Sequence, residues 1–133
     1  GGGQHRALWG DDYRESANEN IMIVAMIESP AGVDAVEEIA AVEHVDIVMV
    51  ASTDLGSFSG LRQGNPRYES MVEEVRQVTL DAGLALGGPQ AWRERDGFQF
   101  FQGPSDANLL RLGVERSLET LGSGVAEIEG SER

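Results

Sequence analysis

Two short apolar runs, separated by a segment of helical length, constrain the fold of this 133-residue chain most strongly. The first covers residues 21–27, and the second, which contains a single acidic residue, covers residues 45–51. Both runs are rich in β-branched residues and too short for a buried helix of ordinary length, which is typical of strands covered on both faces of a parallel sheet. Between them, Ser29 and Pro30 predict a helix start, as N-cap and first helical residue, and the helix is expected to continue to about Val42.

The next part of the chain repeats this alternation. Residues 55–66 show no periodicity and are predicted to form a loop. An amphipathic helix is predicted from Tyr68, with apolar residues three and four apart, and Gly83 is its expected C-cap. Short strands are expected at residues 84–86 and 98–101, with only a short connection between them.

The last predicted helix runs from Asp106 to Gly122. The segment after it, residues 123–133, is acidic, contains glycine and serine, and is expected to form a flexible tail. The sequence therefore predicts one folded region over residues 1–122.

The predicted order of elements is strand, helix, strand, helix, strand, short connection, strand, helix. Such alternation indicates an α/β fold with a parallel sheet and helical crossovers. Four strands suit a small open sheet, or half of a (β/α)₈ barrel whose full length is typically about 250 residues. The length of the chain favours the open sheet, whereas the residues at the strand ends favour the half barrel.

Composition excludes several kinds of chemistry. All ten basic residues are arginine, and lysine and cysteine are absent, so this chain offers no Schiff base, thiolate, disulfide or zinc ribbon. With only two histidines, His5 and His44, an all-histidine metal site is impossible. Any metal bound by this chain alone should have oxygen ligands, which favours magnesium, calcium or manganese.

The charge of the chain bears on its partners and location. The 23 acidic residues against 10 basic ones give a formal net charge of −13, which disfavours nucleic acid and anionic membranes as partners. Neither a signal peptide nor an apolar run of membrane-spanning length is visible. A cytoplasmic location is therefore expected.

Two carboxylates follow the first two predicted strands at matching positions. Glu28 comes directly after the first strand, and Asp54 lies just beyond the second. Because functional groups in parallel α/β folds gather at the carboxyl edge of the strands, we expect these side chains to lie side by side. An acid at one such position could simply stabilise a helix N-terminus, but two at matching positions favour a magnesium or manganese site.

Two motifs resemble the HpcH/HpaI aldolase family. They are IESPAGV within residues 17–42 and VDIVMVASTDLGSFSG at residues 45–60. Residues 98–113 resemble the last strand and helix of that family, and the resemblance extends over about residues 1–121. It implies the second half of a (β/α)₈ TIM barrel with an abbreviated seventh helix. It also implies a metal-dependent class II pyruvate aldolase, similar to 2,4-dihydroxyhept-2-ene-1,7-dioate aldolase.

The resemblance also implies roles for individual residues. Glu28 and Asp54 match the metal ligands of the family, and the backbone N–H groups of Thr53 and Asp54 match those that hold the substrate carboxylate, with Ser52 in the same substrate-binding motif. Met26 stands where many members have glutamine, which changes one polar contact to the substrate. The catalytic arginine and the histidine–aspartate pair of the family belong to the first barrel half, which no segment here matches. The chain is thus expected to be a fragment, a shortened protein or one part of a split enzyme.

The function expected from this resemblance is a divalent-metal-dependent aldolase. It would cleave or form aldols between a pyruvate-type 2-oxo acid and an aldehyde, and it is expected to be a homo-oligomer with the other barrel half in the same or another chain. Two alternatives remain. One is a catalytically incomplete half barrel that serves as an assembly module, and the other is a citrate-lyase-like enzyme acting on acyl-CoA.

A few remaining residues carry open or local interpretations. His5 could reach the substrate or lie in an exposed loop, and Arg93 or Arg95 could bind an anionic substrate tail or lie on the surface. His44 is expected on the surface, away from the carboxyl edge of the sheet. The string GPSD at residues 103–106 matches the metal motif of the family letter for letter, but it follows the last strand, so Ser105 or Asp106 is predicted to be a helix N-cap.

Overall fold

The computed structural model describes residues 13–130, and side chains over residues 15–120. The chain divides into two compact units, Gly1–Gln102 and Gly103–Arg133. The first unit contains a four-stranded parallel sheet in which the strands lie in sequence order. The strands are β1 (Val24–Ile27), β2 (Ile47–Val50), β3 (Ala85–Pro89) and β4 (Phe98–Gln102). The predicted α/β fold with four parallel strands is therefore confirmed.

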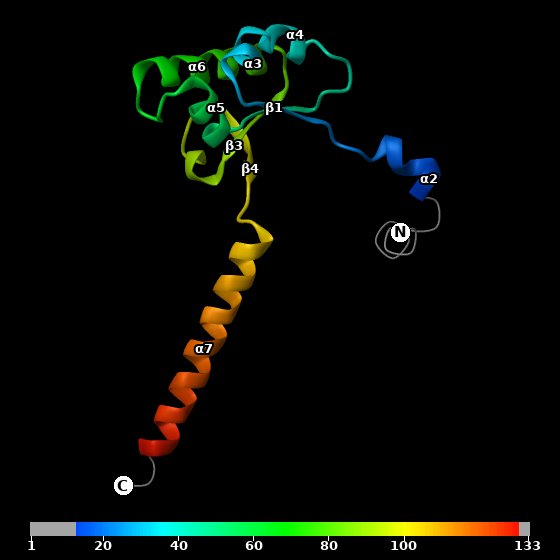
Figure 1. Ribbon diagram of the computed structural model, residues 1–133. Helices are drawn as coiled ribbons and strands as arrows, with labels where there is room; N and C mark the ends of the chain where they lie inside the picture. The colour runs from blue at the N-terminus through cyan, green and yellow to red at the C-terminus, as the bar shows by residue number, and fades with distance from the viewer. Residues whose placement is uncertain (1–12, 131–133) are drawn as a thin grey trace. The chain divides into compact units, whose positions relative to one another are not determined.

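The helices that the structure describes in the first unit lie before β1 or between the strands. They are α2 (Tyr13–Ser16), η1 (Ala17–Glu19), α3 (Pro30–Asp34), α4 (Val36–Ala40), α5 (Ser52–Ser59), α6 (Pro66–Asp81) and the one-turn η2 (Gln90–Trp92). Helices α3, α4 and α6 gather on one side of the sheet (Figure 1). The single turn of η2 confirms that the connection between β3 and β4 lacks a full helix.

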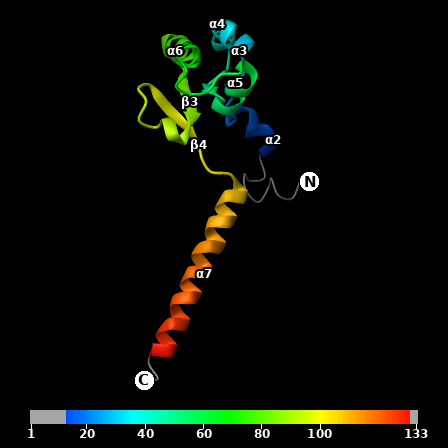
Figure 2. The same ribbon diagram turned by 60° about the vertical axis from the view of Figure 1, so that its left-hand side comes forward.

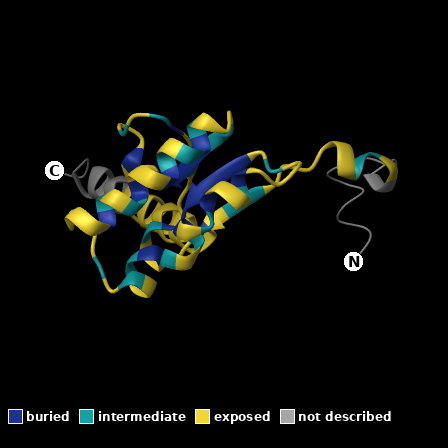
Figure 3. Cartoon of the chain, turned by 90° about the horizontal axis from the view of Figure 1, so that it is seen from above, coloured by how far each residue is buried: buried dark blue, intermediate teal, exposed yellow. Residues whose placement is uncertain are grey.

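The core fills the space between these helices and the sheet, where the buried residues concentrate (Figure 3). Alternate residues of the strands supply one wall, including Ile27, Val48 and Leu86, which are at most 1% exposed. Helix α6 supplies Val72 and Val75 to the same cluster, at three-residue spacing along one face. The apolar face that the sequence predicted for this helix is therefore the face of α6 that packs on the sheet.

One helix prediction and one loop prediction for the first unit were wrong in detail. The helix expected from Ser29 to Val42 is divided at Ala35 into α3 and α4. Ser29 is nevertheless the predicted N-cap, because its Oγ accepts a hydrogen bond from the N–H of Gly32 at 3.2 Å. The loop expected at residues 55–66 begins with a helix instead, since α5 extends to Ser59 and only the remainder is loop.

The loop that precedes α6 is fastened to the segment between β3 and β4. Trp92 Nε1 donates to Gln63 Oε1 at 3.1 Å, and the Arg95 guanidinium lies 4.1 Å from the centre of the Trp92 ring. Glu69 accepts from the Gly64 N–H at 2.7 Å and from Arg95 at 2.9 Å. Burial would raise the pKa of Glu69, but these two hydrogen bonds outweigh it and hold the pKa below its ordinary value.

We expect this network to contribute stability that depends on pH. Because the pKa of Glu69 is lower in the folded state, its contribution is present above the unfolded-state pKa and is lost as the pH falls through the folded-state value. Glu69→Gln should lower the free energy of unfolding by roughly 0.5–1 kcal/mol at pH 7 and flatten the acid limb of the stability curve, as measured by urea denaturation. Glu74→Gln, on an exposed side chain of the same helix, is the control. If the free energy of unfolding of Glu69→Gln falls as steeply with decreasing pH as that of the wild type, this prediction is contradicted.

Over residues 103–130 of the second unit, the structure describes one helix, α7 (Asp106–Gly130), which is continuous in Figure 2. Ser105 is its N-cap, as predicted, with Oγ accepting from the Asn108 N–H at 3.3 Å. The helix continues beyond Gly122, where the sequence analysis ended it. Among the described residues, neither α7 nor any other helix has the length and apolar character needed to cross a membrane.

Candidate active site at the carboxyl edge of the sheet

One face of the sheet is not packed against α3, α4 or α6, and its side chains line up across the strands. Met26, Met49, Gly87 and Phe100 occupy one row in register. A side chain at Gly87 would collide with both neighbours in that row, since its Cβ would lie 2.9 Å from Met49 Cγ and 3.1 Å from Phe100 Cδ1. The side chains of Met49 and Phe100 therefore occupy the space beside Gly87, and Met49 is only 5% exposed.

A hollow of about 150 Å³ opens at the carboxyl end of this face. The last residues of three strands and the first residues of α5 converge on it. Its lining consists of Met26, Val50, Ala51, Ser52, Thr53, Asp54, Pro89 and Gln102. Functional groups were expected at the carboxyl edge of the sheet, and Ser52, Thr53 and Asp54 line the hollow at this edge.

The start of α5 presents free backbone donors to this hollow. The first N–H groups of an α-helix have no acceptor within the helix. The N-cap position is Ala51, whose side chain cannot accept a hydrogen bond, and no side chain caps α5. The corner that carries Ser52, Thr53 and Asp54 can therefore bind an anion such as a carboxylate.

The two predicted metal ligands lie at the same edge but in different surroundings. Asp54 lines the hollow from the first turn of α5, whereas Glu28 follows β1 by one residue and is not part of the lining. Both are exposed, and neither makes a hydrogen bond or ion pair within residues 13–130.

These carboxylates fit a hard divalent cation by the chemistry of their donors. Both offer free oxygen ligands, which suit Mg²⁺ or Mn²⁺. No cluster of three or more candidate ligand side chains occurs among the residues that the structure describes. A cation held by Glu28 and Asp54 would thus keep coordination positions for water or substrate, as Mg²⁺ sites usually do. The assignment of Glu28 and Asp54 remains a prediction.

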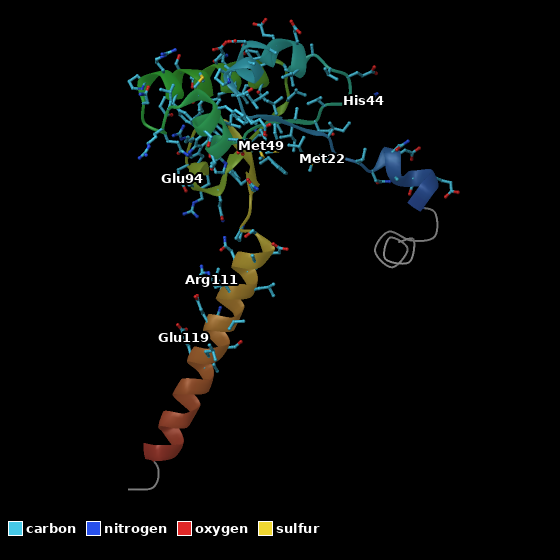
Figure 4. The ribbon with its side chains drawn as sticks, in the orientation of Figure 1. Met22, His44, Met49, Glu94, Arg111 and Glu119 are labelled. Atoms are coloured by element: carbon cyan, nitrogen blue, oxygen red, sulfur yellow. The ribbon has the colours of Figure 1, made fainter. Side chains whose placement is uncertain are left out.

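The other singled-out residues lie outside the hollow. His44 is on the surface before β2, as expected, with its side chain 78% exposed and 3.5 Å from Glu43 (Figure 4). Arg93 pairs with Glu94, and Arg95 is engaged by Glu69 and Trp92, so neither faces this site. His5 lies outside the described residues.

Four residues in or beside the hollow were not predicted to contribute to the site: Pro89 and Gln102, which line it, and Tyr68 and Trp92, which support the surrounding segments. Pro89 and Gln102 lie at the ends of β3 and β4; a polar residue directly after the predicted strand was an available signal for Gln102, and Pro89 carried none. Tyr68 was predicted only as the beginning of a helix, and Trp92 lies in the short connection predicted between residues 86 and 98. Both are buried, at 0% and 3% exposure; Tyr68 donates a hydrogen bond to the Ser52 carbonyl in α5, and Trp92 donates one to Gln63 in the loop before α6.

Comparisons with known proteins show to which family the chain is similar. The sequence model of the family described as HpcH/HpaI aldolase/citrate lyase matches residues 4–88. A hydroxypyruvate/pyruvate aldolase from Delftia acidovorans is 37% identical over 124 residues, covering 84% of this chain and 45% of that protein. A 5-keto-4-deoxy-D-glucarate aldolase from Salmonella arizonae is 37% identical over 119 residues, covering 82% of this chain and 46% of that protein.

A solved structure shows the same fold. An HpcH/HpaI aldolase/citrate lyase family protein from Burkholderia cenocepacia superposes with a TM-score of 0.65 and 28% sequence identity, covering 86% of this chain and 49% of that one. The chain spans about half the length of the curated relatives it matches. Its four parallel strands correspond to about half of a TIM-barrel aldolase structure.

Proposed function

The chain belongs to the HpcH/HpaI aldolase/citrate lyase family, and we propose that it supplies the metal-binding and 2-oxo-acid-binding half of a class II aldolase site. The reaction is the cleavage or formation of an aldol between a pyruvate-type 2-oxo acid and an aldehyde. One observation carries the proposal: Ser52, Thr53 and Asp54 line the hollow at the carboxyl edge, at the uncapped start of α5. The catalytic proton-transfer groups would come from the first barrel half, in the same or another chain.

The residues of the chain have separate tasks in this proposal. The N–H groups of Thr53 and Asp54 hold the substrate carboxylate, because they are fixed donors that need no reorganisation. The carboxylates of Glu28 and Asp54 hold Mg²⁺ or Mn²⁺. When bound, the cation supplies Lewis-acid stabilisation of the negative charge that develops on the keto oxygen. Met26 and Pro89 supply apolar side chains to the lining of the hollow beside these groups.

A proton-exchange experiment tests this function. With the first barrel half supplied, we expect the pyruvate methyl protons to exchange with deuterium, as followed by ¹H NMR, only when a divalent metal is present. EDTA should stop the exchange, and the 133-residue chain alone should show almost none. The absence of lysine removes an enamine route within this chain. Exchange that survives EDTA, or a covalent pyruvate adduct of this chain trapped by borohydride, would overturn the proposal.

A second candidate is a half barrel that acts only as an assembly module. It is favoured by the apolar side chains exposed on and before the edge strand β1, which would be covered by a complementary half. Ile21, Met22, Ile23 and Met26 are between 41% and 65% exposed. Association with a first half that produces no metal-dependent exchange would select this candidate over the aldolase. A homo-oligomer is compatible with both candidates.

A further inference from the structure

The buried hydroxyl of Tyr68 reaches the first residue of α5. Tyr68 lies in the first turn of α6 and is 0% exposed, and its Oη donates to the carbonyl oxygen of Ser52 at 2.9 Å. Its ring lies beside α5, since a Cβ on Gly56 would be 3.9 Å from Tyr68 Cε2. This contact joins two residues 16 positions apart and ties the start of α5 to the longest helix of the first unit.

The carbonyl that Tyr68 binds belongs to the same peptide group as the Thr53 N–H. The peptide group is planar, and in its trans form the C=O and N–H bonds point in opposite directions. A donor that fixes the oxygen of Ser52 therefore also fixes the direction of the Thr53 N–H. Thr53 lines the hollow, and its N–H lies in the uncapped first turn of α5.

Neighbouring residues at the start of α6 hold Tyr68 in place. Asn65 caps α6, with Oδ1 accepting from the Arg67 N–H at 2.9 Å, and Pro66 is the first helical residue. The next residue, Glu69, is held by Gly64 and Arg95. Burial raises the pKa of the Tyr68 hydroxyl, and the charge of Glu69 raises it further, so the group remains a protonated donor at neutral pH.

We propose that Tyr68 is a positioning residue that orients and polarises the Thr53 N–H toward the carboxylate of the 2-oxo acid. The inference rests on the proposed function. Hydrogen bonds in a chain strengthen one another, because a donor on the carbonyl oxygen makes the N–H of the same peptide group a better donor. Tyr68 thus acts on the ligand through one peptide group without touching it.

A purely structural role for Tyr68 gives a different expectation. In that case, removing its hydroxyl costs stability and leaves the geometry of the site unchanged. Thr79 provides the matched control, because it lies on the same helix and is also 0% exposed. Its Oγ1 donates to the Val75 carbonyl at 2.6 Å, within α6 and not to α5. Thr79→Val therefore removes one buried hydroxyl without changing the contact to Ser52.

The experiment compares Tyr68→Phe with Thr79→Val in the complete enzyme. Oxalate, a planar dianion that resembles a 2-oxo acid in its chelating oxygens, is titrated by calorimetry at saturating Mn²⁺, and Mn²⁺ is titrated alone. We expect Tyr68→Phe to weaken oxalate binding about five- to tenfold while Mn²⁺ affinity changes less than twofold, since one charge-assisted hydrogen bond is misdirected. The KM for pyruvate should rise by the same factor, with a smaller change in kcat. Thr79→Val should leave both affinities within twofold.

A rescue variant separates the donor from the ring. Replacing Tyr68 with 4-aminophenylalanine keeps an aromatic donor and should restore at least half of the oxalate affinity that Tyr68→Phe loses. If Tyr68→Phe does not fold, the oxalate affinity of this variant is compared with that of the wild type. The inference is overturned if Tyr68→Phe binds oxalate as the wild type does, if Thr79→Val weakens it equally, or if the rescue variant folds and binds no better than Tyr68→Phe. Failure of the proposed function gives a distinct result, because the wild type itself would then not bind oxalate in the presence of Mn²⁺.

Discussion

Asp54→Ala is expected to reduce metal-dependent exchange of the pyruvate methyl protons by more than about 100-fold, because it removes one of only two carboxylates proposed to hold the cation. The substitution keeps the backbone N–H groups of residues 53 and 54, so it separates the metal role of Asp54 from the carboxylate-binding role of the same corner. Exchange is measured by ¹H NMR in D₂O, and Mn²⁺ affinity by calorimetry. Both should fall together.

Asp106→Ala is the matched control for Asp54→Ala. Asp106 is the aspartate of the GPSD string, which copies the metal motif of the family letter for letter. It is the first residue of α7, and its Oδ1 accepts from the Ala107 N–H at 2.7 Å, as helix-starting acids do. Exchange should remain within twofold of the wild type in Asp106→Ala, whereas Glu28→Gln should weaken Mn²⁺ binding severely. Loss of exchange in Asp106→Ala together with retention in Asp54→Ala would move the metal site to the second unit.

The strand β2 was predictable because burial on both faces leaves a direct mark on the sequence. Residues 47–50 are buried without exception, which is what an uninterrupted apolar run in a central parallel strand requires. Residues 21–23 belong to an equally apolar run, yet they precede β1 and are more than 40% exposed. An apolar run thus indicates a strand, but it gives neither the bounds of the strand nor the exposure of each residue.

Helix α5 was not predictable from local sequence. Its eight residues, STDLGSFS, include serine, threonine and glycine, which have low helix propensity. Tertiary contacts hold it instead: Leu55 is 0% exposed in the core, and the Ser52 carbonyl receives the Tyr68 hydroxyl. The sequence analysis put Ser52, Thr53 and Asp54 directly after the second strand and before the predicted loop, whereas in the structure they are the first three residues of a helix.

Which residue of β4 lines the hollow depends on a β-bulge, and no sequence pattern predicted this bulge. The pairing of β3 with β4 shifts by one residue between Leu86 and Gly87, so that Gln102 lies opposite Pro89. Without that shift, Phe101 would lie opposite Pro89, and its aromatic ring would replace the amide of Gln102. Because side chains alternate across a strand, one inserted residue decides which of the two lines the site.

The burial of Trp92 depends on a glycine in β3. A Cβ on Gly88 would lie 2.9 Å from Phe98 Cε1 and 3.0 Å from Trp92 Cε3. These rings pack edge to face with centroids 5.3 Å apart, and both residues are at most 8% exposed, so neither can move aside into solvent. A polar segment such as QAWRERD does not predict a buried tryptophan, because the space for its ring is made by a residue of the preceding strand.

Gly88→Ala is accordingly expected to destabilise the first unit by about 2–3 kcal/mol, which for a unit of this size corresponds to a fall in Tm of about 10 °C or more. The methyl group must displace Trp92, which releases Gln63 and the loop before α6. Gly32→Ala is the control, since its Cβ would meet no atom closer than 3.5 Å and alanine favours the helical backbone of α3. Thermal denaturation followed by circular dichroism measures both variants. A Gly88→Ala protein that melts within about 2 °C of the wild type would mean that the rings can move aside, and that β3 does not fix the position of Trp92.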